Sequence, residues 1–212
     1  MRIIVMGTGP FAVPMFESIL AAGHDVPVVV TRPVPPARGR KKPPTNPLRE
    51  AANQHGLKLL DPADVNAADV VAELADLQAD LLVVCDFGQI LSPAALGVTP
   101  LGGINLHGSL LPKYRGAAPV QWAIINGDAT TGVTVIHMTP KLDGGPALCQ
   151  IEVAIEATET AEQLEHRLAA LGAPAVIDAI DILAKWDQTS AIGTLQDKKL
   201  VTQAPRLHKQ LG

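Results

Sequence analysis

Two polar side chains at the end of an apolar segment have the types and the spacing that carbonyl chemistry requires. Asn105 and His107 follow Gly103-Ile104 and stand two residues apart. Residues i and i+2 of a strand point to the same face, so one amide and one imidazole can address a single small volume. An imidazole gives or takes a proton near neutral pH, and an amide N–H donates to a developing oxyanion. Taken alone, such a pair more often satisfies backbone groups at a strand end.

The residues around the pair change this interpretation. Asn105 and His107 open the pattern Asn-x-His-x-Ser-Leu-Leu-Pro, which ends at Pro112. This run resembles the signature of the formyltetrahydrofolate-dependent transferases. In that family an Asn, a His two residues later and a downstream Asp form the catalytic trio. The resemblance places the third member at Asp143, within Leu142-Asp143-Gly144-Gly145.

The trio implies a direct transfer of a formyl group from 10-formyltetrahydrofolate, the co-substrate, to an amine. The tetrahedral intermediate needs an oxyanion donor, a sink for the amine proton and protonation of the leaving nitrogen. Asn105 can supply the first, and His107 or a water that it polarises can supply the second. Asp143 can either orient the imidazole or hold a water that shuttles protons. Because the transfer is direct, no acyl-enzyme is required. The two cysteines and Ser109 are poor nucleophile candidates, because no base is evidently paired with them.

Apolar runs and turn residues predict the elements that position these side chains. Unbroken apolar runs predict buried strands, and segments 132–138 and 147–155 predict a hairpin. We therefore expect an α/β fold: a Rossmann-like, open, mostly parallel sheet with an antiparallel hairpin at one side and helices on both faces. The other expected strands are 2–6, 26–31, 58–60 and 80–85, and the expected helices include 47–56, 63–77 and a long helix after the capping box Thr160–Gln163, bent or split at Gly172 and Pro174.

The resemblance also implies which residues bind the folate and the acceptor. The loop after the strand 80–85 lies where open α/β sheets bind ligands, and in the family its backbone holds the pterin ring. The implied folate-binding residues are Phe87, Gly88, Gln89, Ile90, Leu91, Ser109, Leu110, Leu111 and Pro112. GTGPFAVP at the first turn resembles the methionyl-tRNA formyltransferases, where this turn lies beside the aminoacyl group, and it implies a pocket of Gly9, Phe11 and Pro14.

A proline-rich segment, 32–47, carries a concentrated positive charge in an acidic chain. Its basic run, at 38–42, contains Arg38, Arg40, Lys41 and Lys42. Such a segment is an exposed, semi-stiff loop, and its cations can contact several phosphates. A solvated loop without a partner is the alternative. In methionyl-tRNA formyltransferases a similar insertion reaches into the tRNA acceptor arm, so the resemblance implies the initiator methionyl-tRNA as partner.

The composition of the chain limits which partners, cellular compartment and metal sites are expected. The chain has 212 residues, 47% hydrophobic, and a formal net charge of −4. No apolar run reaches the ~18 residues of a membrane span, and no membrane or DNA partner is expected. Cys85 and Cys149 lie in separate apolar runs and predict reduced thiols in the cytoplasm. The Cys and His spacing suits no metal site.

The resemblance extends from Met1 to about Pro205 and suggests the domain organisation. We expect a catalytic domain at 1–190 and a terminal strand or linker at 191–212. Ala204-Pro205-Arg206-Leu207 resembles the element that precedes a C-terminal β-barrel domain in the family, so we expect that domain to be absent here.

Two departures from the methionyl-tRNA pattern leave other acceptors open. Gly144-Gly145-Pro146 is closer to the glycinamide ribonucleotide transformylases. HGSLLPKYRG resembles enzymes that formylate a 4-amino sugar nucleotide, although those tend to have Arg where this chain has Ala117. A folate-binding module without catalytic activity is an alternative of another class.

Overall fold

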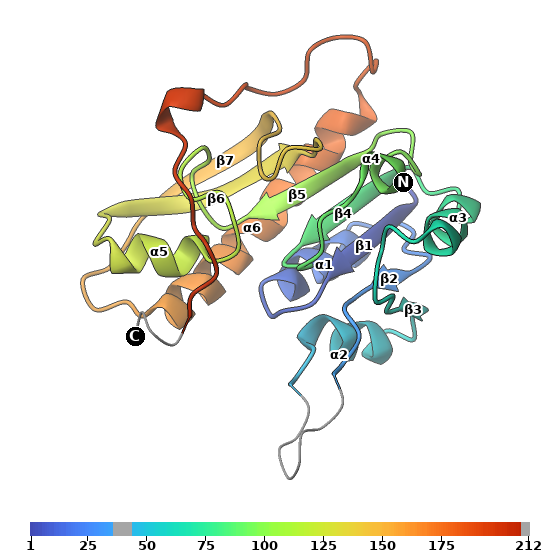
Figure 1. The fold of residues 1–212 in the computed structure, drawn as a ribbon, viewed down its shortest axis with the longest axis horizontal. Helices are drawn as coiled ribbons and strands as arrows, with labels where there is room; N and C mark the ends of the chain where they lie inside the picture. Colours follow the sequence, from blue (N-terminus) through green and yellow to red (C-terminus); the bar gives the residue numbers. More distant parts are fainter. Residues whose placement is uncertain (36–43, 209–212) are drawn as a thin grey trace.

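Residues 1–35 and 44–208, described by a computed structural model, form a seven-stranded sheet with helices on both faces (Figure 1). The strand order is β3-β2-β1-β4-β5-β6-β7. The strands are β1 Ile3–Gly7, β2 Val29–Val30, β3 Leu59–Leu60, β4 Leu81–Cys85, β5 Gly103–His107, β6 Thr130–His137 and β7 Ala147–Ala154. The helices are α1 Ala12–Ala21, α2 Pro47–Gln54, α3 Ala68–Asp76, α4 Pro93–Leu96, α5 Pro119–Ile125, α6 Ala161–Ala184 and the 3₁₀ helix η1 Lys198–Leu200.

The direction of the strands confirms the predicted fold class. Strands β3, β2, β1, β4 and β5 pair in parallel, and β6 and β7 add an antiparallel hairpin at one edge. The chain leaves β1 toward β2 on one side and reaches β4 on the other. The order of the strands therefore reverses between β1 and β4, which is where open α/β sheets place their ligands.

Each face of the sheet buries its own hydrophobic core. On one face, alternate side chains of β1, β4, β5 and β6 pack against α1, α2 and α6, with Phe16 and Leu168 fully buried. On the other face, Leu82 and Val84 pack with Val65 and Leu74 under α3 and α4. Because both faces are covered, the parallel strands β1, β2 and β4 are apolar at every position. This pattern explains why the strand cores were predictable.

Three elements differ from their predicted extents. The second strand is only Val29–Val30. The helix expected at 63–77 begins at Ala68, because the side chains of Gln89 and Asn66 tie residues 62–66 to the loop after β4. The long helix α6 is one helix and not two, although it contains Pro174. Its Gly172 lies directly on β5, where an added Cβ would lie 2.7 Å from the Leu106 side chain.

The final segment is not a strand in the part of the chain that the structure describes. Residues 187–208 contain η1 and extended backbone, which pairs through single bridges at Thr194 and Gln203. In Figure 1 this segment, coloured orange to red, crosses β6 and passes α5. The proposed linker function of 191–212 stays a prediction.

Among the described helices, none combines the length and the hydropathy that crossing a membrane requires.

Candidate active site

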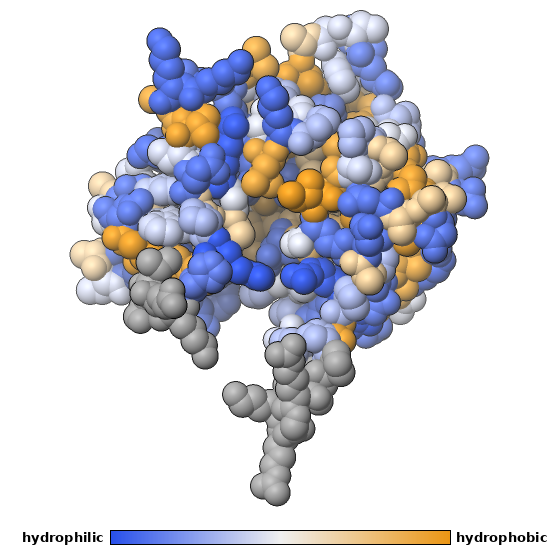
Figure 2. Space-filling view, in the orientation of Figure 1, coloured by the Kyte–Doolittle hydropathy of each residue, from blue (hydrophilic) through white to orange (hydrophobic). Residues whose placement is uncertain are grey.

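A cleft of about 570 Å³ opens at the carboxyl ends of β1, β4 and β5. Figure 2 shows this face of the molecule hollowed near its middle, with hydrophobic side chains at the rim. Loops from widely separated parts of the sequence form the walls, including those after β1, β4, β5 and β6. The cleft therefore lies at the reversal of strand order and is large enough for a small organic ligand.

Strand β5 brings Asn105 and His107 to this cleft. Both residues line it, as the two-residue period of a strand requires. Asn105 is half-buried, and His107 is only 6% exposed. Neighbouring strands hold β5 on both sides, with Asn105 opposite Val84 on β4 and Ile136 on β6. The two side chains therefore stand on an interior strand of the sheet.

A backbone carbonyl fixes the tautomer of His107. Its Nε2 lies 2.8 Å from the carbonyl oxygen of Tyr114. A carbonyl only accepts hydrogen bonds, so Nε2 carries a proton and donates it. In the neutral ring the lone pair is therefore on Nδ1, the nitrogen nearer to Asp143. This arrangement leaves Nδ1 able to take a proton.

Asp143 reaches the same cleft from the loop between β6 and β7. Its Oδ2 lies 3.9 Å from His107 Nδ1 and accepts a 2.8 Å hydrogen bond from the backbone N–H of Gly116. The residue has a φ of 46°, a left-handed conformation that costs free energy in a non-glycine residue. The surrounding contacts must compensate that cost. The structure thus brings together the three residues predicted to be catalytic.

The predicted folate-binding residues fall into two groups. Phe87 to Leu91 all line the cleft. Ile90 is 68% exposed, whereas the Gln89 side chain is occupied by the Val65 N–H and the Pro62 carbonyl. This leaves the backbone and the apolar side chains of the loop available to a ligand.

The second group lies outside the lining of the cleft. Ser109 is buried and donates to the Lys113 carbonyl, and Leu111 N–H donates to Thr134 Oγ1. Leu111 and Pro112 line a separate hollow of about 300 Å³ beside β7. In this structure Ser109, Leu110, Leu111 and Pro112 shape the loop after β5, and a folate contact for them stays a prediction.

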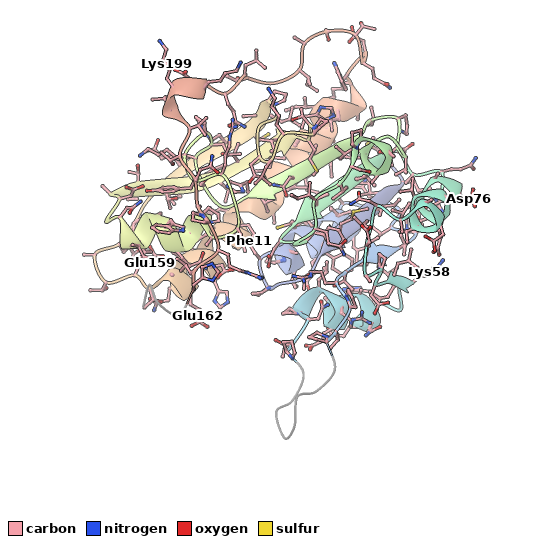
Figure 3. All side chains as sticks on the ribbon, viewed as in Figure 1. Phe11, Lys58, Asp76, Glu159, Glu162 and Lys199 are labelled. Carbon is pink, nitrogen blue, oxygen red and sulfur yellow. The ribbon has the colours of Figure 1, made fainter. Side chains whose placement is uncertain are left out.

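Only some of the residues predicted to bind the acceptor line the cleft. Gly9 and Phe11 line the cleft, with Phe11 labelled in Figure 3, while Pro14 lies in α1 away from the lining. An added Cβ at Gly9 would lie 1.9 Å from Asp86 Oδ2, so a larger residue there would displace the Asp86 side chain. The residues predicted to bind tRNA, Arg38, Arg40, Lys41 and Lys42, lie outside the described residues.

The comparison with known families decides the assignment. The family described as formyl transferase matches residues 1–180. This chain belongs to the formyl transferase family. The resemblance predicted from the sequence is therefore confirmed.

Curated relatives and solved structures agree with the formyl transferase assignment. "Methionyl-tRNA formyltransferase" of Rhodopirellula baltica is 50% identical over 99% of this chain, which covers 64% of that protein. The protein of the same name from Methylacidiphilum infernorum is 44% identical over 86% of this chain and 58% of its own length. The chain thus spans less than two thirds of these relatives. Glycinamide ribonucleotide transformylase 1 from Symbiobacterium toebii is 25% identical, with a TM-score of 0.70 and 87% of each chain covered.

Five charged residues of the cleft were missed by sequence reasoning. They are Arg32, Asp86, Lys141, Glu165 and Arg206. Asp86 follows β4 directly, so its position at a strand's carboxyl end was a usable signal. Glu165 on α6 and Arg206 in the final segment have no local sequence signal, because only the tertiary fold brings them here. Within the described residues, no group of three or more His, Cys, Asp or Glu could hold a metal ion.

The cleft raises the pKa of Asp86 to about 6. Although the residue as a whole is exposed, desolvation of its carboxyl is the largest cause, and the charge of Glu165 adds to it. The backbone N–H of Gly9 and the cations Arg32 and Arg206 oppose the shift. The carboxyl is therefore partly protonated near neutral pH.

We expect this shift to appear in the pH dependence of stability. The folded state favours protonated Asp86, so its contribution is complete below about pH 4 and is lost as the pH rises through about 6. Asp86→Asn removes this loss, so the free energy of unfolding of the variant should fall less than that of wild type between pH 4 and 7. Urea unfolding at a series of pH values measures the difference. Parallel curves for the two proteins would mean that Asp86 titrates normally.

Proposed function

We propose that this chain transfers the formyl group of 10-formyltetrahydrofolate to the amino group of initiator methionyl-tRNA. The observation that carries the acceptor assignment is the identity of 50% over 99% of the chain to a relative named for that reaction. The solved structures named for ribonucleotide or amino-sugar acceptors are 19–25% identical. A cytoplasmic location, predicted from the sequence, suits this acceptor.

The size and the lining of the cleft support a folate as the formyl donor. A volume of about 570 Å³ lies within the range of small-molecule sites. In the proposal, the backbone of residues 87–91 holds the pterin ring, and the apolar side chains Ile90 and Leu91 cover it. One related structure, the N-formyltransferase from Helicobacter canadensis, is described as a complex with folinic acid and dTDP-3-aminofucose and has a TM-score of 0.71 at 20% identity, which supports the fold alone.

The three converging side chains can perform the transfer in two steps. The acceptor nitrogen attacks the formyl carbon, the carbonyl oxygen becomes an oxyanion, and the Asn105 amide donates a hydrogen bond to it. His107 Nδ1 takes the proton that the amine loses, while the Asp143 carboxylate stabilises the resulting imidazolium. When the bond from carbon to the folate nitrogen breaks, the imidazolium returns the proton to that nitrogen. Atoms and charges balance without an acyl-enzyme.

Parallel assays with three classes of acceptor test the proposal. The protein is incubated with 10-formyltetrahydrofolate and, separately, with methionyl-tRNA, a 4-amino sugar nucleotide or glycinamide ribonucleotide. We expect the formyl group on methionyl-tRNA. Formylation of only one of the small acceptors would overturn the acceptor assignment. If the wild-type protein formylates none of the three acceptors, but binds folate as well as the His107→Ala variant does, a folate-binding module without catalytic activity would be favoured.

Removing the basic run should weaken tRNA recognition alone. We expect Arg40→Ala, Lys41→Ala and Lys42→Ala together to raise KM for methionyl-tRNA by about 10-fold, because three phosphate contacts are lost. Turnover on a small amine should stay unchanged, and the salt dependence of KM for tRNA should become shallower. Steady-state kinetics at several salt concentrations measures both effects. Unchanged formylation of methionyl-tRNA by the triple variant would remove the main local support for the tRNA assignment.

A further inference from the structure

An extended segment of the chain, residues 194–205, holds the wall of the cleft; we call it the C-terminal strap. Its backbone pairs with segment 112–118 through the bonds Arg115 N–H to Thr202 O, Ala204 N–H to Arg115 O and Ala118 N–H to Ala204 O. Gly116 has a φ of 126°, and an added Cβ would lie 2.6 Å from the Ala204 carbonyl oxygen. Only glycine allows the strap to approach this closely.

The segment that the strap holds is the one that contacts the two ionisable members of the trio. Within it, the Tyr114 carbonyl accepts from His107, and the Gly116 N–H donates to Asp143. Thr202 of the strap also accepts the Tyr114 N–H, at 2.8 Å. The strap therefore sets the backbone positions from which both side chains are oriented.

One side chain of the strap bridges the two walls of the cleft. Gln196 Oε1 accepts from Arg115 Nε at 3.1 Å and from the terminal nitrogen of the same guanidinium at 2.6 Å. Its Nε2 donates to the carbonyls of Asp143 and Gly145, at 2.8 and 2.7 Å. The amide thus uses two donors and an acceptor with two lone pairs. Neither a carboxylate nor an aliphatic side chain can make all four bonds.

We propose that Gln196 is a positioning residue for formyl transfer. Asp143 has a left-handed backbone, which costs free energy unless its surroundings hold it. Gln196 holds the Asp143 carbonyl against Arg115, next to the Gly116 N–H that binds the Asp143 carboxylate. The 3.9 Å separation between Asp143 and His107 depends on this bridge. The kinetic consequence rests on the proposed function, whereas the structural consequence does not.

Gln196→Leu tests the bridge with two independent readouts. We expect kcat for formyl transfer to fall about 10- to 100-fold with KM for the formyl donor nearly unchanged, because a small displacement of a reacting group is costly. We also expect the Gly116 amide to exchange its hydrogen about 10-fold faster, while amides of β1 and β4 keep their protection. Amide exchange needs no turnover, so it still decides the matter if the wild type formylates none of the acceptors.

Two further variants complete the test. Gln203→Leu makes the same chemical change in the strap at an exposed side chain, which has no hydrogen bond to any described residue, and it should behave as wild type. Gln196→Glu keeps an acceptor for the Arg115 guanidinium but loses both N–H donors. As the pH falls, the Glu carboxyl becomes protonated and regains one donor, so the activity of this variant relative to wild type should rise. Unchanged Gly116 exchange in Gln196→Leu and Gln196→Glu, or equal losses in Gln196→Leu and Gln203→Leu, would overturn the proposal.

Discussion

Replacing His107 with Ala should lower kcat for formyl transfer by about 10³-fold, within the range that general acid–base catalysis contributes. In the proposed mechanism the imidazole moves the proton from the acceptor amine to the leaving nitrogen, and no other described imidazole lines the cleft. KM for the formyl donor should change little, because the variant leaves unchanged the loop after β4 that we propose binds folate. Rapid-quench measurement of formylated methionyl-tRNA under single-turnover conditions checks the rate of the chemical step.

His137 provides a matched control for this variant. It lies at the end of β6 and is half-buried, whereas His107 is buried, and its Nε2 lies 2.9 Å from the backbone carbonyl oxygen of Leu101, much as Nε2 of His107 lies 2.8 Å from that of Tyr114. It does not line the cleft. His137→Ala therefore removes a similar bond and should retain the wild-type rate. An equal loss of rate in both variants would assign the effect of His107→Ala to folding, and a fully active His107→Ala would exclude the imidazole from the reaction.

Replacing Asp143 with Asn should lower kcat by about 10²- to 10³-fold while leaving the fold intact. The Asn side chain keeps an oxygen that can accept the Gly116 N–H bond, and Asn tolerates the left-handed backbone of this position. What the variant loses is the negative charge 3.9 Å from His107 Nδ1, which in the proposed mechanism stabilises the imidazolium formed during transfer. The single-turnover rate and the thermal unfolding temperature together measure the effect.

Asp143→Ala separates charge from position. It removes both the charge and the acceptor for Gly116, so a further loss beyond Asp143→Asn measures what the hydrogen bond contributes. If Asp143→Asn keeps the wild-type rate, the carboxylate has no electrostatic part in the reaction and the proposed mechanism is wrong at that step.

The sheet and the position of the cleft were predictable because they depend on local patterns. Buried parallel strands such as β1 and β4 are apolar without interruption, and the carboxyl ends of such strands meet at one edge. The two-residue period of β5 was enough to place Asn105 beside His107. The capping box at Thr160 and Gln163 predicted the start of α6.

The parts that were not predictable depend on contacts between distant segments. Asp143 was predicted only through the family resemblance. Its position in the sequence does not indicate that the Gly116 N–H binds its carboxylate. Gln196 was not singled out, because its four bonds go to irregular backbone and to one guanidinium far away in the sequence. The late start of α3 has the same origin, in side-chain bonds from Gln89. Tertiary hydrogen bonds of this kind have no period and no composition signal.

The fate of a labelled formyl group in a single turnover tests the proposed reaction most directly. The 212-residue protein, in excess over 10-formyltetrahydrofolate labelled in the formyl carbon, is mixed with methionyl-tRNA and quenched at successive times. We predict that the label passes from folate to the methionyl amino group without first becoming bound to protein, and that His107→Ala and Asp143→Asn slow this passage. Label that accumulates on the protein before it reaches the tRNA, or transfer at the wild-type rate in both variants, would contradict the account.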